Sequence, residues 1–275
     1  NRGYRMNVKK NEDALLRVED LTVCYDGETA VQNVSFQVKK GEILGIVGES
    51  GSGKSTVAKA VMGLLGNRAR VTGQVWYKGE NLTAMPEKML RKYRGPELGM
   101  VFQDCKSALC PMRTVGAQMY EAVSEHEKVS RAEVENRAAV LMKKIGLTDC
   151  ARVLGSYPFE LSGGMNQRVG ICAAMLLKPD LLLADEPTSA LDVTVQKQVV
   201  EELLLMKKEF HTSMLLITHN IGVVRKMADR ILVLQNGKIM DYGDTQKVLE
   251  NPESQYTRQL MESVIRLKRR EDQKL

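Results

Sequence analysis

The sequence lacks the features that mark secreted, zinc-binding and membrane-spanning proteins. Its five cysteines are an odd number and widely spread, with no C-x-x-C pair and no histidine placed to complete a metal site, which argues against a disulfide framework or a zinc centre. This cysteine usage fits a reducing cytosol. The start has no apolar signal core, and the longest uncharged apolar stretch, residues 169–177, is about half of what crosses a bilayer. We therefore expect a chain that does not span a membrane by itself.

The net charge is a weak guide to function. A formal charge of +6 and a sequence pI near 9.0 point at first to nucleic acid or a membrane surface. Residues 1–10 carry +4 and residues 266–275 carry +3, which leaves −1 on residues 11–265. We therefore expect no nucleic-acid partner. One interpretation of residues 1–5, which precede Met6, is a remnant of a cloning vector.

Hydrophobic periodicity predicts an α/β protein large enough to bury a sizeable core. Apolar and polar residues roughly alternate over 15–23 and 34–38, which predicts two half-buried antiparallel strands joined by a turn at 25–27. Three continuous apolar runs, each followed by a helical pattern, predict strands buried on both faces: residues 42–47, 181–184 and 213–217. The core should therefore be a parallel sheet flanked by helices.

Two further patterns divide the chain. Helical periodicity replaces the strand runs from about residue 104 to 160, as in Val134, Ala138, Leu141 and Ile145, and predicts an inserted helical subdomain. Farther on, the apolar run 231–234, the Asn-Gly pair at 236–237 and the run 238–240 predict a tight hairpin. The last thirty residues are predicted to form a charged helical tail.

Residues 48–55, Gly-Glu-Ser-Gly-Ser-Gly-Lys-Ser, fit the pattern G-x-x-x-x-G-K-[ST] between a buried strand and a helix expected to open at Ser55. Glycines let backbone N–H groups converge on phosphate oxygens, and the helix N-terminus adds its positive end. Lys54 would neutralise the β- and γ-phosphates, and the Ser55 hydroxyl would ligate Mg²⁺. The predicted phosphate-binding set is Gly48, Glu49, Ser50, Gly51, Ser52, Gly53, Lys54, Ser55 and Thr56.

An acidic pair, Asp185-Glu186, follows the predicted strand 181–184, at the edge where a parallel sheet presents groups to a ligand. Asp185 is expected to hold Mg²⁺ through water, and Glu186 to orient and polarise the attacking water. Acidic residues after a strand are common. The interpretation therefore depends on the phosphate-binding loop upstream.

Residues 161–168, Leu-Ser-Gly-Gly-Met-Asn-Gln-Arg, resemble the L-S-G-G-Q signature of the ATP-binding cassette (ABC) family, with Met165 in the variable fifth position. They precede an apolar helical stretch, so Ser162, Gly163 and Gly164 would form an anion site at a helix N-terminus. The resemblance implies that this site faces away from its own loop and closes over the ATP of a second cassette, either a paralogue or a copy.

The same resemblance implies roles at four other positions. Tyr25 resembles the aromatic residue that stacks on adenine, although a core tyrosine at a strand end is the alternative. Gln103 resembles the Q-loop glutamine that senses Mg²⁺ and the γ-phosphate. Asp192, in the segment 189–192, resembles the D-loop aspartate. His219 resembles the switch histidine on the γ-phosphate, which would act with Lys54 and Glu186 in catalysis; the other histidines, His126 and His211, are interpreted as solvated.

The family resemblance also implies the fold class: an α/β, ABC-type P-loop NTPase with a RecA-like parallel-sheet core, an antiparallel β subdomain and an inserted α-helical subdomain. We expect the domain boundaries to follow these ranges: an N-terminal extension at 1–13, the ATP-binding core at 14–103 and 161–245, the helical subdomain at 104–160, and a C-terminal family tail at 246–275.

The segment after Gln103 and the motif Asn251-Pro252 with Tyr256-Thr257-Arg258 resemble the peptide/nickel importer ATPases. No cysteine follows Cys172, whereas peptide importers often carry a later cysteine cluster, so the short D-type nickel or metal-chelate branch is favoured. The resemblance implies an ATP-hydrolysing subunit on the cytoplasmic face of the membrane. Its partners would be a second ABC ATPase subunit, two transmembrane permeases and, indirectly, an extracytoplasmic solute-binding protein.

Three alternatives stay open. The nearest is the accessory soluble ABC ATPase of a phosphonate carbon–phosphorus lyase complex. Cassettes of DNA repair or translation are less favoured, because the chain has neither a long coiled-coil insertion nor a second cassette. A degenerate cassette that binds ATP without hydrolysing it is opposed by the intact Lys54, Asp185, Glu186 and His219.

Overall fold

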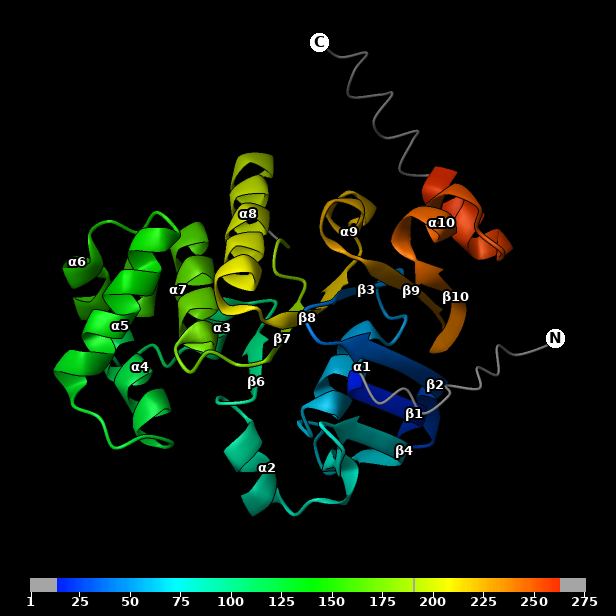
Figure 1. Cartoon of the computed structure of the whole chain (residues 1–275), viewed down its shortest axis with the longest axis horizontal. Coiled ribbons are helices and arrows are strands. Elements are labelled where there is room, and N and C mark those ends of the chain that lie inside the picture. Colours follow the sequence, from blue (N-terminus) through cyan, green and yellow to red (C-terminus); the bar gives the residue numbers. More distant parts are fainter. Residues whose placement is uncertain (1–13, 190, 263–275) are drawn as a thin grey trace, which may run out of the picture. The chain divides into compact units, whose positions relative to one another are not determined.

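The computed structural model describes residues 14–189 and 191–262. The predicted N-terminal extension, the charged end of the predicted tail and Ala190 of the D-loop-like segment lie outside these residues. The chain forms two compact units (Figure 1), of which unit 1 comprises residues up to Met85 and from Leu215, and unit 2 comprises Pro86–Met214. Of the helices in the described part of the chain, none combines the length and the apolar character needed to cross a bilayer.

Unit 1 contains an antiparallel sheet in the order β2-β1-β4-β5. Its strands are β2 (Glu28–Lys39), β1 (Ala14–Tyr25), β4 (Ala69–Tyr77) and β5 (Glu80–Asn81). The predicted antiparallel pair is confirmed, although β1 and β2 are both longer than their alternating patterns indicate. Val18 pairs with Phe36, and both are fully buried. The sequence patterns did not predict β4, because five of its nine residues in succession are exposed and show no alternation.

A second set of strands in unit 1 runs in the order β10-β9-β3-β8. They are β10 (Lys238–Asp244), β9 (Arg230–Gln235), β3 (Ile43–Val47) and β8 (Ser213–Thr218). β3 and β9 are parallel, and every residue of β3 is buried, as its continuous apolar run predicts. β9 and β10 form the predicted antiparallel hairpin, with positive φ angles of 48° at Asn236 and 73° at Gly237.

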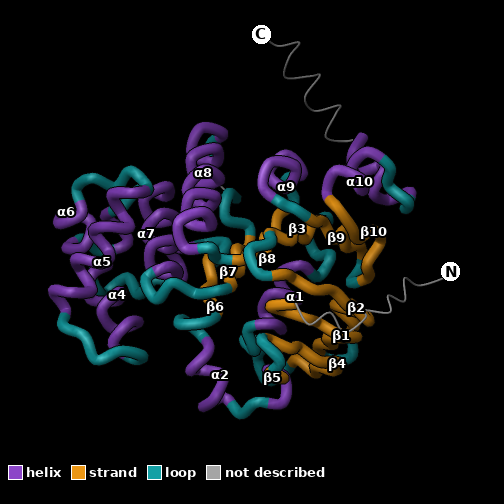
Figure 2. Tube along the Cα trace, in the orientation of Figure 1, coloured by secondary structure: helices purple, strands orange, loops and turns teal. Residues whose placement is uncertain are grey.

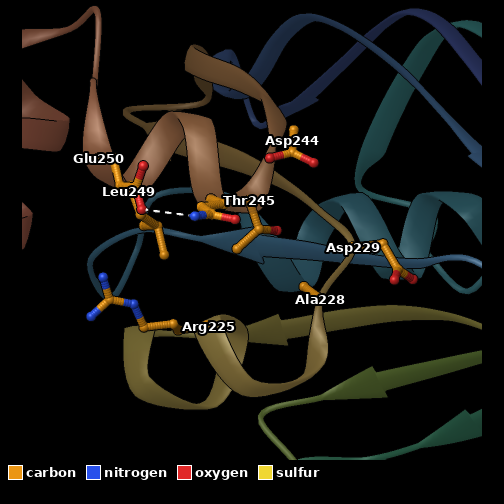
Figure 3. A pocket seen from close by; sticks show the side chains of 8 residues that line it. Arg225, Ala228, Asp229, Asp244, Thr245, Leu249 and Glu250 are labelled. Carbon is orange, nitrogen blue, oxygen red and sulfur yellow. Dashed lines mark hydrogen bonds between the residues drawn. The ribbon is translucent and has the colours of Figure 1, made fainter.

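The helices of unit 1 are α1 (Lys54–Val61), α9 (Ile221–Met227) and α10 (Thr245–Glu250), together with a 3₁₀ turn at Leu82–Ala84 and a helical stretch at residues 255–262. Helix α10 contacts α9 and β9. The backbone N–H of Thr245 donates to the Asp229 carbonyl oxygen at 3.1 Å. A polar hollow of about 460 Å³ lies beside this contact, and Arg225, Asp229, Thr245 and Glu250 are among its lining residues (Figure 3).

Unit 2 consists of two parallel strands and a group of helices. The strands are β6 (Leu98–Val101) and β7 (Leu181–Asp185). The helices are α2 (Glu87–Tyr93), α3 (Cys105–Ala108), α4 (Val115–Ser124), α5 (Arg131–Lys144), α6 (Cys150–Gly155), α7 (Gly163–Met175) and α8 (Val193–Phe210), with a 3₁₀ turn at Pro158–Glu160. Figure 2 shows α4, α5, α6 and α7 gathered side by side, and these helices are in contact. The predicted face Val134, Ala138, Leu141 and Ile145 is buried.

Helices α4 to α8 of unit 2 each begin at a capping side chain. Thr114, Ser130, Asp149, Ser162 and Asp192 each accept a hydrogen bond from a backbone N–H in the first turn of the helix that follows. Helix α7 starts at Gly163 with Ser162 as its N-cap, which is the helix N-terminus that the sequence predicted for Ser162, Gly163 and Gly164. Its first turns are polar, and Asn166 and Gln167 within them are buried.

Candidate phosphate-binding site

Unit 1 holds the glycine-rich segment 48–53, which connects the buried strand β3 to helix α1. Helix α1 begins at Lys54, one residue before the predicted start at Ser55. Gly48 and Gly53 are required by close backbone contacts: a Cβ on Gly48 would lie 2.2 Å from the Leu234 carbonyl oxygen, and a Cβ on Gly53 would lie 2.6 Å from that of Ala30. Gly53 also has a φ of 99°. The loop is therefore a tight turn with no room for side chains at Gly48 and Gly53, so its backbone lies next to the start of the helix.

Lys54 is buried within this loop. Its side chain is 6% exposed, and its ammonium Nζ donates to the carbonyl oxygens of Gly48 at 2.8 Å and Glu49 at 2.7 Å. These two carbonyls hold the positive charge beside the first turn of α1, where unpaired backbone N–H groups and the helix dipole favour an anion.

Ser52 adds a polar group with no protein partner. The residue is 4% exposed, and its Oγ has no hydrogen-bond partner among the described residues. Because buried polar groups are normally hydrogen-bonded, an unsatisfied hydroxyl in the loop whose carbonyls hold the Lys54 ammonium fits a ligand that carries oxygen atoms. The donor chemistry of the loop therefore fits phosphate. Ser55 and Thr56 follow in the first turn of α1 and are half-buried.

Two other predicted site residues lie in unit 1. Tyr25 ends β1 and is half-buried, next to the exposed turn at 26–27. His219 follows β8 directly and is exposed. Neither residue lines the hollow of Figure 3.

The acidic pair lies in unit 2, at the carboxyl end of the buried strand β7. Asp185 is 5% exposed and Glu186 is 7% exposed. Glu186 has a φ of 48°, a conformation that costs energy in a residue other than glycine and is typical of functional sites. The backbone N–H and the hydroxyl of Ser189 both donate to the Glu186 carbonyl oxygen, at 3.1 and 3.0 Å. Both the backbone and the side chain of Ser189 therefore hold the turn after Glu186 in place.

Gln103 also lies in unit 2, two residues after β6, and is exposed. The next residue, Asp104, caps α3 by accepting from the backbone N–H of Ser107 at 3.1 Å. The pKa of the Asp104 carboxyl is lowered, first of all by its hydrogen bond from the Ser107 hydroxyl. The segment after Gln103 is therefore held by its own capping network.

The signature-like segment begins α7. Ser162 is its N-cap, with Oγ accepting from the Met165 backbone N–H at 3.3 Å, and Ser162 and Gly163 are exposed. A Cβ on Gly164 would lie 3.2 Å from a methyl of Val195 in α8. Asp192, the exposed N-cap of α8, accepts from the backbone N–H of the same Val195 at 3.0 Å. Within unit 2, Gly164 and Asp192 therefore both lie next to Val195.

Sequence reasoning missed Asn166, which is 1% exposed. Its side-chain Nδ2 donates to the carbonyl oxygens of Pro158, Leu161 and Ser162, at 2.9, 3.2 and 3.3 Å. This amide ties the first turn of α7 to the segment before it. The available signal was a polar residue two positions after the glycine pair 163–164, in a segment that leads into an apolar helix.

Comparison with known proteins gives a consistent result. The family model described as "ABC transporter" matches residues 31–189. The chain is 42% identical to the metal-staphylopine import system ATP-binding protein CntD of Staphylococcus aureus (strain NCTC 8325 / PS 47) over 249 residues, covering 90% of this chain and 92% of that protein. It is 41% identical to the oligopeptide transport ATP-binding protein OppD of Escherichia coli K12 over 263 residues, covering 94% and 78%.

Solved structures of similar fold include cbiO1 from Clostridium perfringens, part of the ABC transporter complex cbiONQ, with a TM-score of 0.74 and 27% identity over 88% of this chain and 92% of that one. Another is the ATP-binding cassette MJ0796 in a post-hydrolysis state bound to ADP and Pi, with a TM-score of 0.75 and 29% identity over 84% and 98%.

Proposed function

Because the chain belongs to the ABC transporter family, we propose that it is the ATP-hydrolysing subunit of an importer for metal chelates or for di- and oligopeptides. The family and the ABC-type α/β fold predicted from sequence are confirmed. The chain is an ATPase whose hydrolysis is coupled to transport. The single observation that carries the site assignment is the buried ammonium of Lys54, held by two loop carbonyls at the start of α1.

We assign the nucleotide contacts residue by residue. In unit 1, the backbone of residues 48–56 and the Lys54 ammonium would bind the phosphates, and Tyr25 would stack on adenine. Oxygen ligands suit Mg²⁺, and Ser55, Gln103 and Asp185 would supply them. Once bound, ATP with Mg²⁺ supplies the phosphoanhydride bond that is cleaved.

Hydrolysis requires an oriented water molecule and a group that accepts its proton. Glu186 would do both, because it directly follows β7 on a backbone that Ser189 holds in place. His219 would contact the terminal phosphate from the end of β8. Lys54 would neutralise the charge that develops on the phosphate oxygens.

A second ABC ATPase subunit would complete the site. Ser162, Gly163 and Gly164 at the start of α7 and Asp192 at the start of α8 would contact the ATP and the interface of that partner. Val193, beside Asp192, is 81% exposed, so its side chain would be available for contact with that partner. We expect a paralogue as the partner, with a homodimer as the alternative.

Unit 2 would also receive the permeases. An apolar hollow of about 270 Å³ lies between the segment after α3 and helices α4 and α7, and its lining includes Leu109, Val115, Met119 and Val169. Met112, in the same segment, is 82% exposed. A transmembrane subunit could insert an apolar side chain there, which would place the ATPase peripherally on the cytoplasmic face of the membrane. The solute would be selected by the permeases and by an extracytoplasmic binding protein.

The test is affinity purification of the tagged chain from solubilised membranes of its native host, followed by phosphate-release assays. We expect two permeases and a second ATPase to co-purify, with ATP hydrolysis that is lost in Lys54→Ala. Recovery of the chain in a soluble carbon–phosphorus lyase core, without permeases, would overturn the proposal. Wild-type hydrolysis by Lys54→Ala would overturn the assignment of the site.

A further inference from the structure

The segment that follows α10 is fixed to unit 1 by a buried carboxylate. Asp241 of β10 is 2% exposed, and it accepts hydrogen bonds from the backbone N–H groups of Glu253 at 3.0 Å and Ser254 at 3.2 Å. Ser254 in turn accepts from the backbone N–H of Thr257 at 3.1 Å, which caps the helical residues 255–262. These bonds fix the backbone on both sides of residue 256. The direction of the side chain at that position is therefore well defined.

That side chain is Tyr256, which reaches the glycine-rich loop. It is 8% exposed and belongs to a hydrophobic cluster that includes Val47, the last residue of β3, and Val233 of β9. Its hydroxyl oxygen accepts a hydrogen bond from the backbone N–H of Glu49 at 3.2 Å. Burial raises the pKa of the Tyr256 phenol, so the group that meets the loop is a neutral hydroxyl at physiological pH.

The bonded N–H belongs to the peptide group that joins Gly48 to Glu49, and the oxygen of the same group holds Lys54. The Gly48 carbonyl oxygen accepts from the Lys54 ammonium at 2.8 Å. A trans peptide group is planar, and its N–H and C=O point in opposite directions. Tyr256 therefore holds one side of this plane while Lys54 is bound to the other. A rotation of the plane would break both bonds.

We propose that Tyr256 is a positioning residue for nucleotide binding: its hydroxyl fixes the Gly48–Glu49 peptide group and, through the Gly48 carbonyl, the ammonium of Lys54. The inference rests on the proposed role of this loop in binding ATP. It extends that role to the C-terminal segment, for which the sequence predicted a family tail and no part in nucleotide binding. Hydrogen bonds in such a chain polarise one another, so the loss of the first weakens the second.

The expected effect is modest and specific. Removing the hydroxyl lets the peptide group rotate, so that only a fraction of the loops present the Lys54 ammonium in the binding geometry, and apparent affinity falls by that fraction. A single hydrogen bond of this kind corresponds to a roughly two- to tenfold change in an equilibrium constant.

The variant Tyr256→Phe removes only the hydroxyl and keeps the ring in its cluster. Tyr242→Phe is a matched control, because Tyr242 is 9% exposed in the same unit, and its hydroxyl accepts from the Gln37 N–H at 3.2 Å and donates to the Gln37 carbonyl at 3.1 Å, away from the loop sequence. Both variants of the full chain are titrated with a fluorescent ATP analogue and Mg²⁺. Amide hydrogen exchange at Glu49 is measured in the same proteins without nucleotide.

We expect Tyr256→Phe to bind the analogue roughly two- to tenfold more weakly and to exchange the Glu49 amide faster by a similar factor, with Tyr242→Phe at wild-type values in both measurements. Unchanged binding and exchange in Tyr256→Phe would overturn the inference, as would equal losses in the two variants. If the wild-type chain bound no nucleotide, the proposed function would fail, while Glu49 exchange would still decide whether Tyr256 holds the loop.

Discussion

The Nε atom of Arg168 lies 2.7 Å from Oε1 of Glu202, in an ion pair that joins α7 to α8 within unit 2. A terminal nitrogen of Arg168 also donates to the side-chain oxygen of Gln198 at 2.7 Å. Helix α7 starts after its N-cap Ser162, and α8 starts after its N-cap Asp192. The pair therefore links the two helices whose N-termini are proposed to meet the second cassette.

Replacing Glu202 with Gln should change how stability depends on pH. Burial raises the pKa of the Glu202 carboxyl to about 7. The positive charge of Arg168 opposes this rise, and the negative charge of Glu201 adds a smaller contribution to it. Burial also raises the pKa of the neighbouring Cys172 thiol. Because the folded state binds this proton more tightly than the unfolded state, the contribution of Glu202 falls as pH rises from about 4.5 to about 7 and is constant above that.

Glu202→Gln keeps an oxygen that can accept from Arg168 and removes the titration. Urea unfolding of both proteins at pH 5, 6, 7 and 8 should therefore show the variant gaining stability relative to wild type as pH rises. Glu201→Gln, at an exposed neighbouring position, removes only the smaller contribution of Glu201 to the Glu202 pKa, so its curve should depart from wild type less than that of Glu202→Gln. Parallel curves for Glu202→Gln and wild type would show that Glu202 is already ionised throughout.

Replacing Glu186 with Gln should separate ATP binding from hydrolysis. The amide has the same shape but cannot accept a proton, so we expect nucleotide affinity to be kept while phosphate release falls by about 10²- to 10⁴-fold. Size-exclusion chromatography with ATP should show the closed dimer accumulating, alone or with the second ATPase. If Glu186→Gln released phosphate at the wild-type rate, Glu186 would not be the base.

A steric contact beside the segment after Gln103 yields a stability prediction. A Cβ on Gly170 of α7 would lie 2.4 Å from Sγ and 2.9 Å from Cβ of Cys105 in α3. Gly170→Ala should therefore destabilise the fold by about 1–3 kcal/mol, as overpacking does. Burial raises the pKa of the Cys105 thiol to about 12, so the conflict is one of volume and not of charge.

Adding Cys105→Ala to Gly170→Ala should restore part of this loss, because it removes the sulfur but leaves the Cβ contact. A double-mutant cycle in urea measures the coupling between the two positions. Gly155→Ala is the matched control, since a Cβ there meets nothing within 4 Å, and its cost should be near zero. Additive effects of the two substitutions would contradict the predicted contact.

The fold could be predicted from sequence where burial is complete or strictly alternating. The runs at β3, β7 and β8 are buried at every position, so their apolar character identified them. By contrast, β4 has a string of exposed residues, and its place beside β1 depends on backbone pairing that composition does not encode. The role of Asn166 was missed for a related reason, because composition does not show that this polar side chain is buried and donates to three carbonyl oxygens.

The candidate site was predictable to the extent that it is local. The spacing of glycines before Lys54 is a property of one loop, and the loop adopts the expected strand-to-helix connection. The contact between Tyr256 and Glu49 joins residues 207 positions apart, and it exists only because the cluster around Val47 places the ring. The left-handed conformation of Glu186 is likewise set by its surroundings, since glutamate has no intrinsic preference for it.

The loop glycines should differ in what they tolerate. A Cβ on Gly48 would lie 2.2 Å from the Leu234 carbonyl oxygen of β9, a backbone atom that a rotamer change cannot move. A Cβ on Gly51 would meet nothing within 4 Å, although its φ of 80° is costly for alanine. Gly48→Ala should therefore displace the Gly48 carbonyl from the Lys54 ammonium and abolish nucleotide binding, whereas Gly51→Ala should cost only about 1 kcal/mol of backbone strain.

Fluorescent ATP titrations and urea midpoints of the two alanine variants measure this difference. The Gly48 variant should show little binding and a lower midpoint, and the Gly51 variant should bind within roughly tenfold of wild type, because strain of about 1 kcal/mol corresponds to a factor of that size or less. Equal losses in the two variants would mean that positive φ alone governs the loop and that the contact with Leu234 adds nothing. A selective loss in Gly48→Ala would instead locate the binding geometry in the peptide group that Lys54 and Tyr256 share.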